Sequence, residues 1–241
     1  YAALILITYR ELDGLMQKGH LSIFVLFLVS IMPTVSVLFS FSWSESELQS
    51  QIFFIFAKLW IILIPIYWIY RIEESRFSLG EINSKGMYQS IVSGILIFLA
   101  VGIIFLIFGD TLDVDLMKQE IGGTGLLNPH IFFLGVFYWI TINSLVEEFV
   151  FRQFIGDRIL EFTGRESVTV LLSAAIFTLH HTVLLGYYFE PWQNVISSIG
   201  IFIAGATWSL LWLRHRSLFL CWISHAIADV AVFGIAYVIL F

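Results

Sequence analysis

Two adjacent glutamates and an arginine interrupt one of the most apolar stretches of this 241-residue chain, the run from 130 to 155. On a helix Glu148 and Arg152 are four residues apart and share a face, which predicts an ion pair between them. Glu147 projects about 100° away from that face, so it lacks this partner and is the better candidate for accepting a proton. The alternative interpretation is that both carboxylates only mark the end of an apolar helix.

A second polar cluster lies in the apolar run that begins at Ser167. Phe177 and His181 share a helix face, whereas the neighbouring His180 points about 100° elsewhere. We therefore expect at most one of the two histidines, His181, to face a site built around Glu147. The alternative is a histidine that only forms a hydrogen bond between helices.

The last apolar run carries a third cluster. His225 and Asp229 are four residues apart, so the carboxylate is expected to orient the imidazole from the same helix face. Cys221 precedes His225 by four residues, which permits a thiol nucleophile with an adjacent base. Cysteine is, however, also a common apolar filler, and as the only cysteine of the chain it cannot form an intramolecular disulfide.

The composition indicates that these polar groups lie in a membrane. Apolar residues make up 59% of the chain and charged residues 12%, and the mean hydropathy is +0.91, values typical of multi-pass membrane proteins. The net charge of -6 and the lack of a basic stripe argue against a nucleic-acid partner. The bilayer itself is the predicted surrounding.

A helix needs about 20 mainly apolar residues to cross the hydrocarbon core. We therefore predict an all-α fold, a polytopic membrane helix bundle in a single domain, 1–241. Segment 1–20 is too short and interrupted for an eighth span, so an interfacial amphipathic helix or part of a truncated span is expected there, and no cleavable signal peptide is indicated. The seven predicted transmembrane spans are 21–42, 51–70, 90–109, 130–155, 167–187, 193–213 and 217–241.

The loops predict the orientation, because cytoplasmic loops carry the excess of Lys and Arg. Ten of the twelve basic residues lie on alternate loops, which places the N-terminus in the cytoplasm and the C-terminus outside. Lys58 falls within the second span and Lys118 on an outer loop. In this topology His181 lies about 14 residues, or about 21 Å, from the inner end of its span, so its depth relative to Glu147 is left open.

In chain order the three clusters read Glu-Glu-x-x-x-Arg, Phe-x-x-x-His and His-x-x-x-Asp. With this order the chain resembles the CAAX protease and bacteriocin-processing family of intramembrane proteases, which includes the Ras-converting CAAX endopeptidase. Each motif alone is weak, whereas all three in order on membrane helices are a strong signal. The matching residues are Glu147, Glu148, Arg152, Phe177, His181, His225 and Asp229.

The resemblance implies an endopeptidase whose site lies within the membrane and opens toward the cytoplasm. It implies that Glu147 is the general base for the attacking water, helped by His181, while His225 and Asp229 stabilise the oxyanion or assist protonation. Many members have asparagine where Asp229 stands, and an ionised aspartate cannot donate a hydrogen bond to an oxyanion. Asp229 is therefore expected to be protonated, to serve His225, or to bind a metal.

The same resemblance implies that Glu148 and Arg152 hold the site together, within a catalytic core of about 130–241. The family has been described both as metal-dependent and as metal-free glutamate proteases. A glutamate and two histidines could bind zinc, although the chain has no His-Glu-x-x-His motif. The candidate ligands are Glu147, His181, His225 and Asp229.

Two other functions compete with proteolysis. A non-catalytic scaffold or immunity protein of the same fold would keep the polar cluster for stability, and a proton-coupled transporter would use Glu, His and Asp as a relay. The substrate class implied for a protease is a membrane-anchored, lipidated or leader-peptide protein.

Overall fold

The computed structural model describes residues 21–74 and 78–241, so the expectation for segment 1–20 lies outside the described residues. All regular structure in the described ranges is helical, and seven helices are long and apolar enough to cross a membrane. The predicted all-α fold with seven spans is thus confirmed. The seven helices are Leu21–Trp43, Glu47–Arg71 (α2), Ser84–Thr111 (α3 with a 3₁₀ turn), Pro129–Thr163, Glu166–Leu185 (α8), Pro191–His215 (α9) and Leu218–Leu240 (α10).

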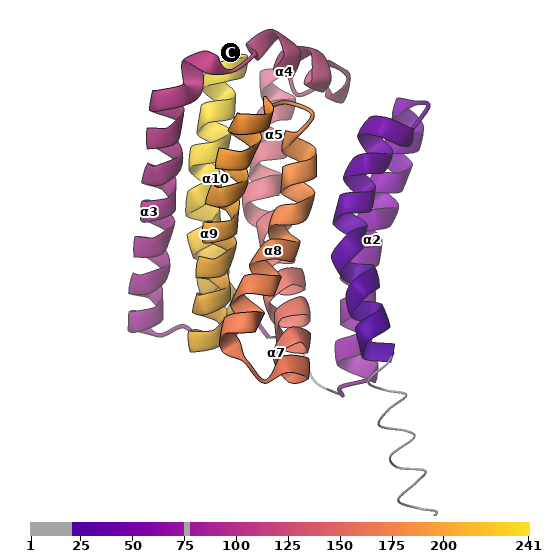
Figure 1. The fold of residues 1–241 in the computed structure, drawn as a ribbon, viewed down its shortest axis with the longest axis vertical. Helices are drawn as coiled ribbons and strands as arrows, with labels where there is room; N and C mark the ends of the chain where they lie inside the picture. The colour runs from indigo at the N-terminus through magenta and orange to yellow at the C-terminus, as the bar shows by residue number, and fades with distance from the viewer. Residues whose placement is uncertain (1–20, 75–77) are drawn as a thin grey trace, which may run out of the picture.

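Figure 1 shows these helices side by side along the long axis of the molecule, with α2 and the first helix paired at one side. The short amphipathic helix α4, Val114–Ile121, lies at the end where the chain terminates. Many large apolar side chains point outward, such as Leu106 and Leu134. This outward apolar surface is what a bilayer solvates.

Local capping determines where several helices begin. Ser46 accepts a hydrogen bond from the amide of Gln49 at the start of α2, and Asn83 accepts one from the amide of Gly86 at the start of α3. Such caps satisfy amide groups that have no partner within the helix. In both cases the cap extends the helix several residues before the apolar run on which the predicted span was based.

The fourth long helix changes its winding along its length, and its end differs from the predicted one. It runs through α5 (Pro129–Tyr138), a π-helical turn (Trp139–Asn143), α6 (Ser144–Glu148), a second π-helical segment (Phe149–Gly156) and α7 (Asp157–Thr163). The predicted end at 155 was therefore too early. Arg158 explains the difference, because it is buried and paired with Glu73 and Glu161.

Small residues bring α3 against α10. Gly86, Ser90 and Gly94 recur every four residues on α3 and are all buried, a spacing that lets two membrane helices approach closely. The Ser93 hydroxyl also lies 2.9 Å from the Ser224 hydroxyl of α10. Close packing and a polar contact therefore hold α3 to the helix that carries His225.

Gly94→Ala is expected to lower the free energy of unfolding by about 1 to 3 kcal/mol, the usual range for overpacking. A Cβ at Gly94 would lie 2.9 Å from both the Ile227 Cβ and the Ser224 carbonyl oxygen. Gly102→Ala is the matched control on the same helix, since a Cβ there meets no atom of the described chain within 4 Å. Thermal unfolding in detergent should separate the two variants, and equal stability would contradict the close packing.

Candidate active site

Glu147 lies near the middle of the long helix Pro129–Thr163 and not at its end. Because this helix continues to Thr163, Glu147 reaches the same depth as the histidines of α8. The single α-helical turn that carries it, Ser144–Glu148, is flanked by the two π-helical segments. Such π-helical insertions change the direction of side chains and are frequent at functional sites.

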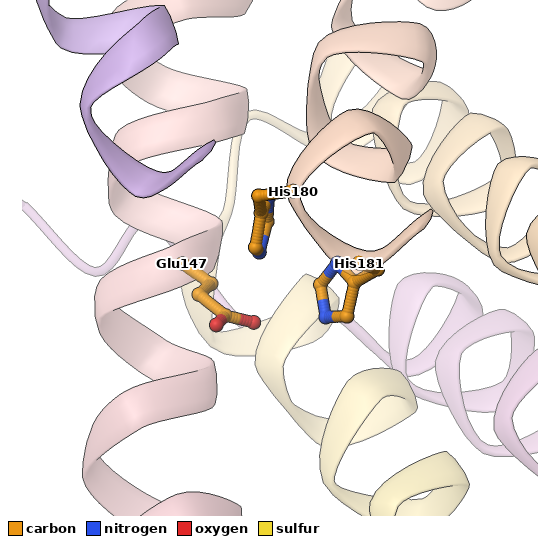
Figure 2. Close-up of side chains that lie close together, drawn as sticks. All are labelled: Glu147, His180 and His181. Atoms are coloured by element: carbon orange, nitrogen blue, oxygen red, sulfur yellow. The ribbon is translucent and has the colours of Figure 1, made fainter. Parts of the chain in front are cut away.

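Glu147 faces both histidines of α8. One ligand atom each of Glu147, His180 and His181 lies within 4.8 Å of the other two, and the Glu147 residue is only 8% exposed. In Figure 2 the Glu147 carboxylate extends toward the ring of His181, and His180 stands on the same side of α8. The expectation that only one of the two histidines faces this site is wrong. Their directions differ by about 100°, but both lie on the half of α8 that faces Glu147.

The two imidazoles have different surroundings. His181 Nδ1 lies 3.0 Å from the Phe177 carbonyl oxygen, and since a carbonyl only accepts, Nδ1 carries the proton. The other nitrogen of a neutral His181 is therefore an acceptor, and it is turned toward Glu147. His180 stacks on Phe151 with ring centres 5.5 Å apart, and its buried Nδ1 has no hydrogen-bond partner within the described part of the chain.

The predicted ion pair between Glu148 and Arg152 is present. Glu148 Oε2 lies 3.1 Å from Arg152 Nε, and both side chains are 0% exposed. The guanidinium also donates to the hydroxyls of Ser173 on α8, at 3.2 Å, and Ser209 on α9, at 3.4 Å. Its carbon lies 4.9 Å from the centre of the Phe177 ring. Arg152 thus connects three helices around a buried carboxylate.

His225 is oriented mainly from another helix. Its Nδ1 lies 2.8 Å from Glu148 Oε1, whereas its Nε2 lies 3.5 Å from Asp229 Oδ1. Asp229 is therefore a more distant neighbour of the imidazole than Glu148 is. The His225 ring is stacked on Trp208 of α9, with centres 3.9 Å apart and planes at 14°. Neither Glu148 nor Trp208 could be assigned this role from i, i+4 spacing, since each lies on a different helix from His225.

The contact between Glu147 and His225 connects the cluster of Glu147 and the α8 histidines to the cluster of Glu148, Arg152 and His225. His225 Nε2 lies 3.8 Å from Glu147 Oε2, so the imidazole stands between the two adjacent glutamates. The predicted residues Glu147, His181, His225 and Asp229 are thereby brought to one place in the interior of the bundle. The buried Cys221 thiol instead lies 3.5 Å from the backbone carbonyl oxygen of Trp208, which favours its interpretation as a packing residue.

Two further polar residues adjoin Glu147. Asn143 Nδ2 donates to Glu147 Oε1 at 2.7 Å, and Lys58 Nζ of α2 donates to Asn143 Oδ1 at 2.5 Å. Sequence analysis had placed Lys58 within a span but had given it no role. Its charge in an apolar helix was the available signal, because such residues usually mark functional sites.

Comparison with known proteins agrees with this arrangement. The family described as Type II CAAX prenyl endopeptidase Rce1-like matches residues 129–231. The matched segment contains every residue of the three motifs and excludes α2 and α3. Neither the curated proteins nor the solved structures contain a match to this chain. The resemblance predicted from the motifs is confirmed, because residues 129–231 match the Rce1-like family.

Proposed function

We propose that this protein is an intramembrane endopeptidase in which Glu147 activates the attacking water with the help of His181. The observation that carries the proposal is the convergence of the Glu147 carboxylate with the imidazoles of α8, within 4.8 Å, inside an apolar helix bundle. Ionisable groups are costly at such depth, and they are usually retained for function. The match of residues 129–231 to a family of prenyl endopeptidases supports the same conclusion.

In this reaction Glu147 accepts a proton from water while the hydroxide forms a bond to the scissile carbonyl carbon. The acceptor nitrogen of His181 orients that water. When the peptide C–N bond breaks, the proton held by Glu147 passes to the leaving amine nitrogen. The water is thereby divided between the two products, and Glu147 returns to its ionised form.

His225 is placed to stabilise the developing oxyanion or to assist protonation. Its Nδ1 donates to Glu148, and its Nε2 faces Glu147 and Asp229. Of the three roles expected for Asp229, service to His225 is supported by their separation of 3.5 Å. An ionised Asp229 then acts through the imidazole and does not have to donate to the oxyanion itself.

The residues present also fit a divalent metal such as zinc. Two imidazoles and a carboxylate are a common catalytic zinc set, and the buried, unpartnered Nδ1 of His180 adds a free ligand atom within the described residues. We therefore assign the metal ligands to Glu147, His180 and His181, whose ligand atoms all lie within 4.8 Å of one another. When bound, the metal would polarise the carbonyl and lower the barrier for attack by water.

The proposed substrate is a membrane-associated or lipidated protein that reaches the site from the cytoplasmic side. The charge pattern of the loops supports a cytoplasmic N-terminus and an extracytoplasmic C-terminus.

The test combines cleavage and metal content. Purified wild type and Glu147→Ala, reconstituted in vesicles, are assayed on a panel of membrane-anchored peptides with and without a prenyl group, and bound metal is measured by mass spectrometry. Cleavage by wild type alone is expected. Equal cleavage by Glu147→Ala would overturn the proposal and favour a role for the cluster in stability. One bound metal in wild type, lost in His180→Ala, would support the assigned ligands.

A further inference from the structure

We infer that Lys58 is a positioning residue for Glu147 and that it acts through Asn143; this inference rests on the proposed function. Lys58 lies at the centre of α2, outside the segment that matches the protease family. The site is therefore completed by a helix that the family motifs do not include.

The chemistry of the three groups fixes the direction of the hydrogen-bond chain. The ionised carboxylate of Glu147 can only accept hydrogen bonds, so the Asn143 amide must present its Nδ2 to it. The amide oxygen then faces Lys58, whose amine donates to it at 2.5 Å. Lys58 thereby selects one of the two orientations that an asparagine amide can adopt. In the other orientation the amide oxygen would face the carboxylate oxygen, and the two would repel each other.

The hydrogen bonds from Lys58 to Asn143 and from Asn143 to Glu147 also determine which oxygen of the Glu147 carboxylate is available to bind water. Asn143 occupies Oε1 at 2.7 Å, while Oε2 points toward His225 Nε2 at 3.8 Å. Because Lys58 restrains Asn143, it holds the Glu147 carboxylate in one rotational state. A general base must lie within hydrogen-bond reach of its water, and a carboxylate that rotates freely meets this condition only part of the time.

The position of Lys58 indicates that it orients Glu147 and does not merely attach α2 to the rest of the bundle. Lysines near helix ends can extend to the membrane interface, but Lys58 is central in α2 and its amine is directed to Asn143. Among the described residues, polar contacts away from Glu147 also join the part of the chain before residue 75 to the rest of the bundle. The Ser42 hydroxyl meets that of Tyr187, and Glu73 pairs with Arg158. These contacts attach the first two helices to the rest of the bundle without reaching Glu147.

The experiment measures kcat and KM for cleavage of a membrane-anchored peptide by reconstituted protein. Lys58→Met is expected to lower kcat about 10- to 100-fold, the effect of losing a charge-assisted hydrogen bond, with KM nearly unchanged. Lys58→Arg keeps donors and should recover part of kcat. In an Asn143→Ala background Lys58→Met should cause no further loss, because the interaction it removes is already absent.

Tyr187→Phe is the matched control, since it removes a contact between the same two parts of the bundle without touching the site. It is expected to keep the wild-type kcat. An unchanged kcat in Lys58→Met, additive losses with Asn143→Ala, or an equal loss in Tyr187→Phe would each overturn the inference. Glu147→Ala is measured in parallel: if it cleaves like wild type, the proposed function fails, whereas inactive Glu147→Ala beside fully active Lys58→Met refutes only the role of Lys58.

Discussion

Glu147→Gln is expected to reduce kcat/KM for a membrane-anchored peptide about a thousandfold, within the range that general acid and base catalysis contributes. Glutamine has nearly the same size as glutamate, and its amide oxygen can still accept the hydrogen bond from Asn143. It cannot take a proton from water. The substitution therefore removes the chemical step while it keeps the packing around α6, and KM should change far less than kcat.

The control is Glu161→Gln, a second glutamate on the same long helix. Its side chain is 58% exposed and pairs only with Arg158 among the described residues, so its cleavage rate should match that of wild type. Thermal unfolding of both variants in detergent should resemble that of wild type. Cleavage by Glu147→Gln within tenfold of wild type would contradict the role of Glu147 as general base.

The features that were predicted correctly from the sequence depend only on residues that are near one another in the sequence. Apolar length predicted the seven spans, because the bilayer requires every helix that crosses it to be long and apolar. The spacing of four residues predicted the pair of Glu148 and Arg152, which is determined by helix geometry alone. Both predictions are independent of how the helices pack against each other.

Features that depend on packing between helices could not be predicted in this way. The hydrogen bond from His225 to Glu148 joins residues 77 positions apart, and that from Lys58 to Asn143 joins residues 85 positions apart. His180 was excluded because only one of two adjacent histidines was expected to face the site, whereas both lie close to Glu147. The missing information in each case was the rotation and depth of neighbouring helices.

The end of the fourth span had the largest consequence for the site. The predicted span ended at 155 because apolar character falls after that position, where Asp157 and Arg158 follow. The structure buries this arginine between Glu73 and Glu161, so the helix continues and Glu147 lies in its middle. A pairing between distant charges thus decided the depth of Glu147, and with it whether Glu147 could meet the histidines of α8.

Arg152→Met is expected to lower the free energy of unfolding by about 3 to 5 kcal/mol, the cost of leaving one partner of a buried ion pair uncompensated. Methionine fills much of the same volume, so the loss comes mainly from Glu148, which is 0% exposed. Among the described residues, Glu148 would then keep only His225 as a partner. The measurement is denaturant-induced unfolding in mixed micelles.

Arg158→Met on the same helix is the matched control for Arg152→Met. Its partners Glu73 and Glu161 are 26% and 58% exposed, so water can solvate them after the change, and a loss of about 1 kcal/mol is expected. Adding Glu148→Gln to Arg152→Met should restore part of the stability, because the amide carries no charge yet can accept from His225. Equal losses in the two arginine variants, or no recovery in the double variant, would show that the cost is lost packing and not an unpaired carboxylate.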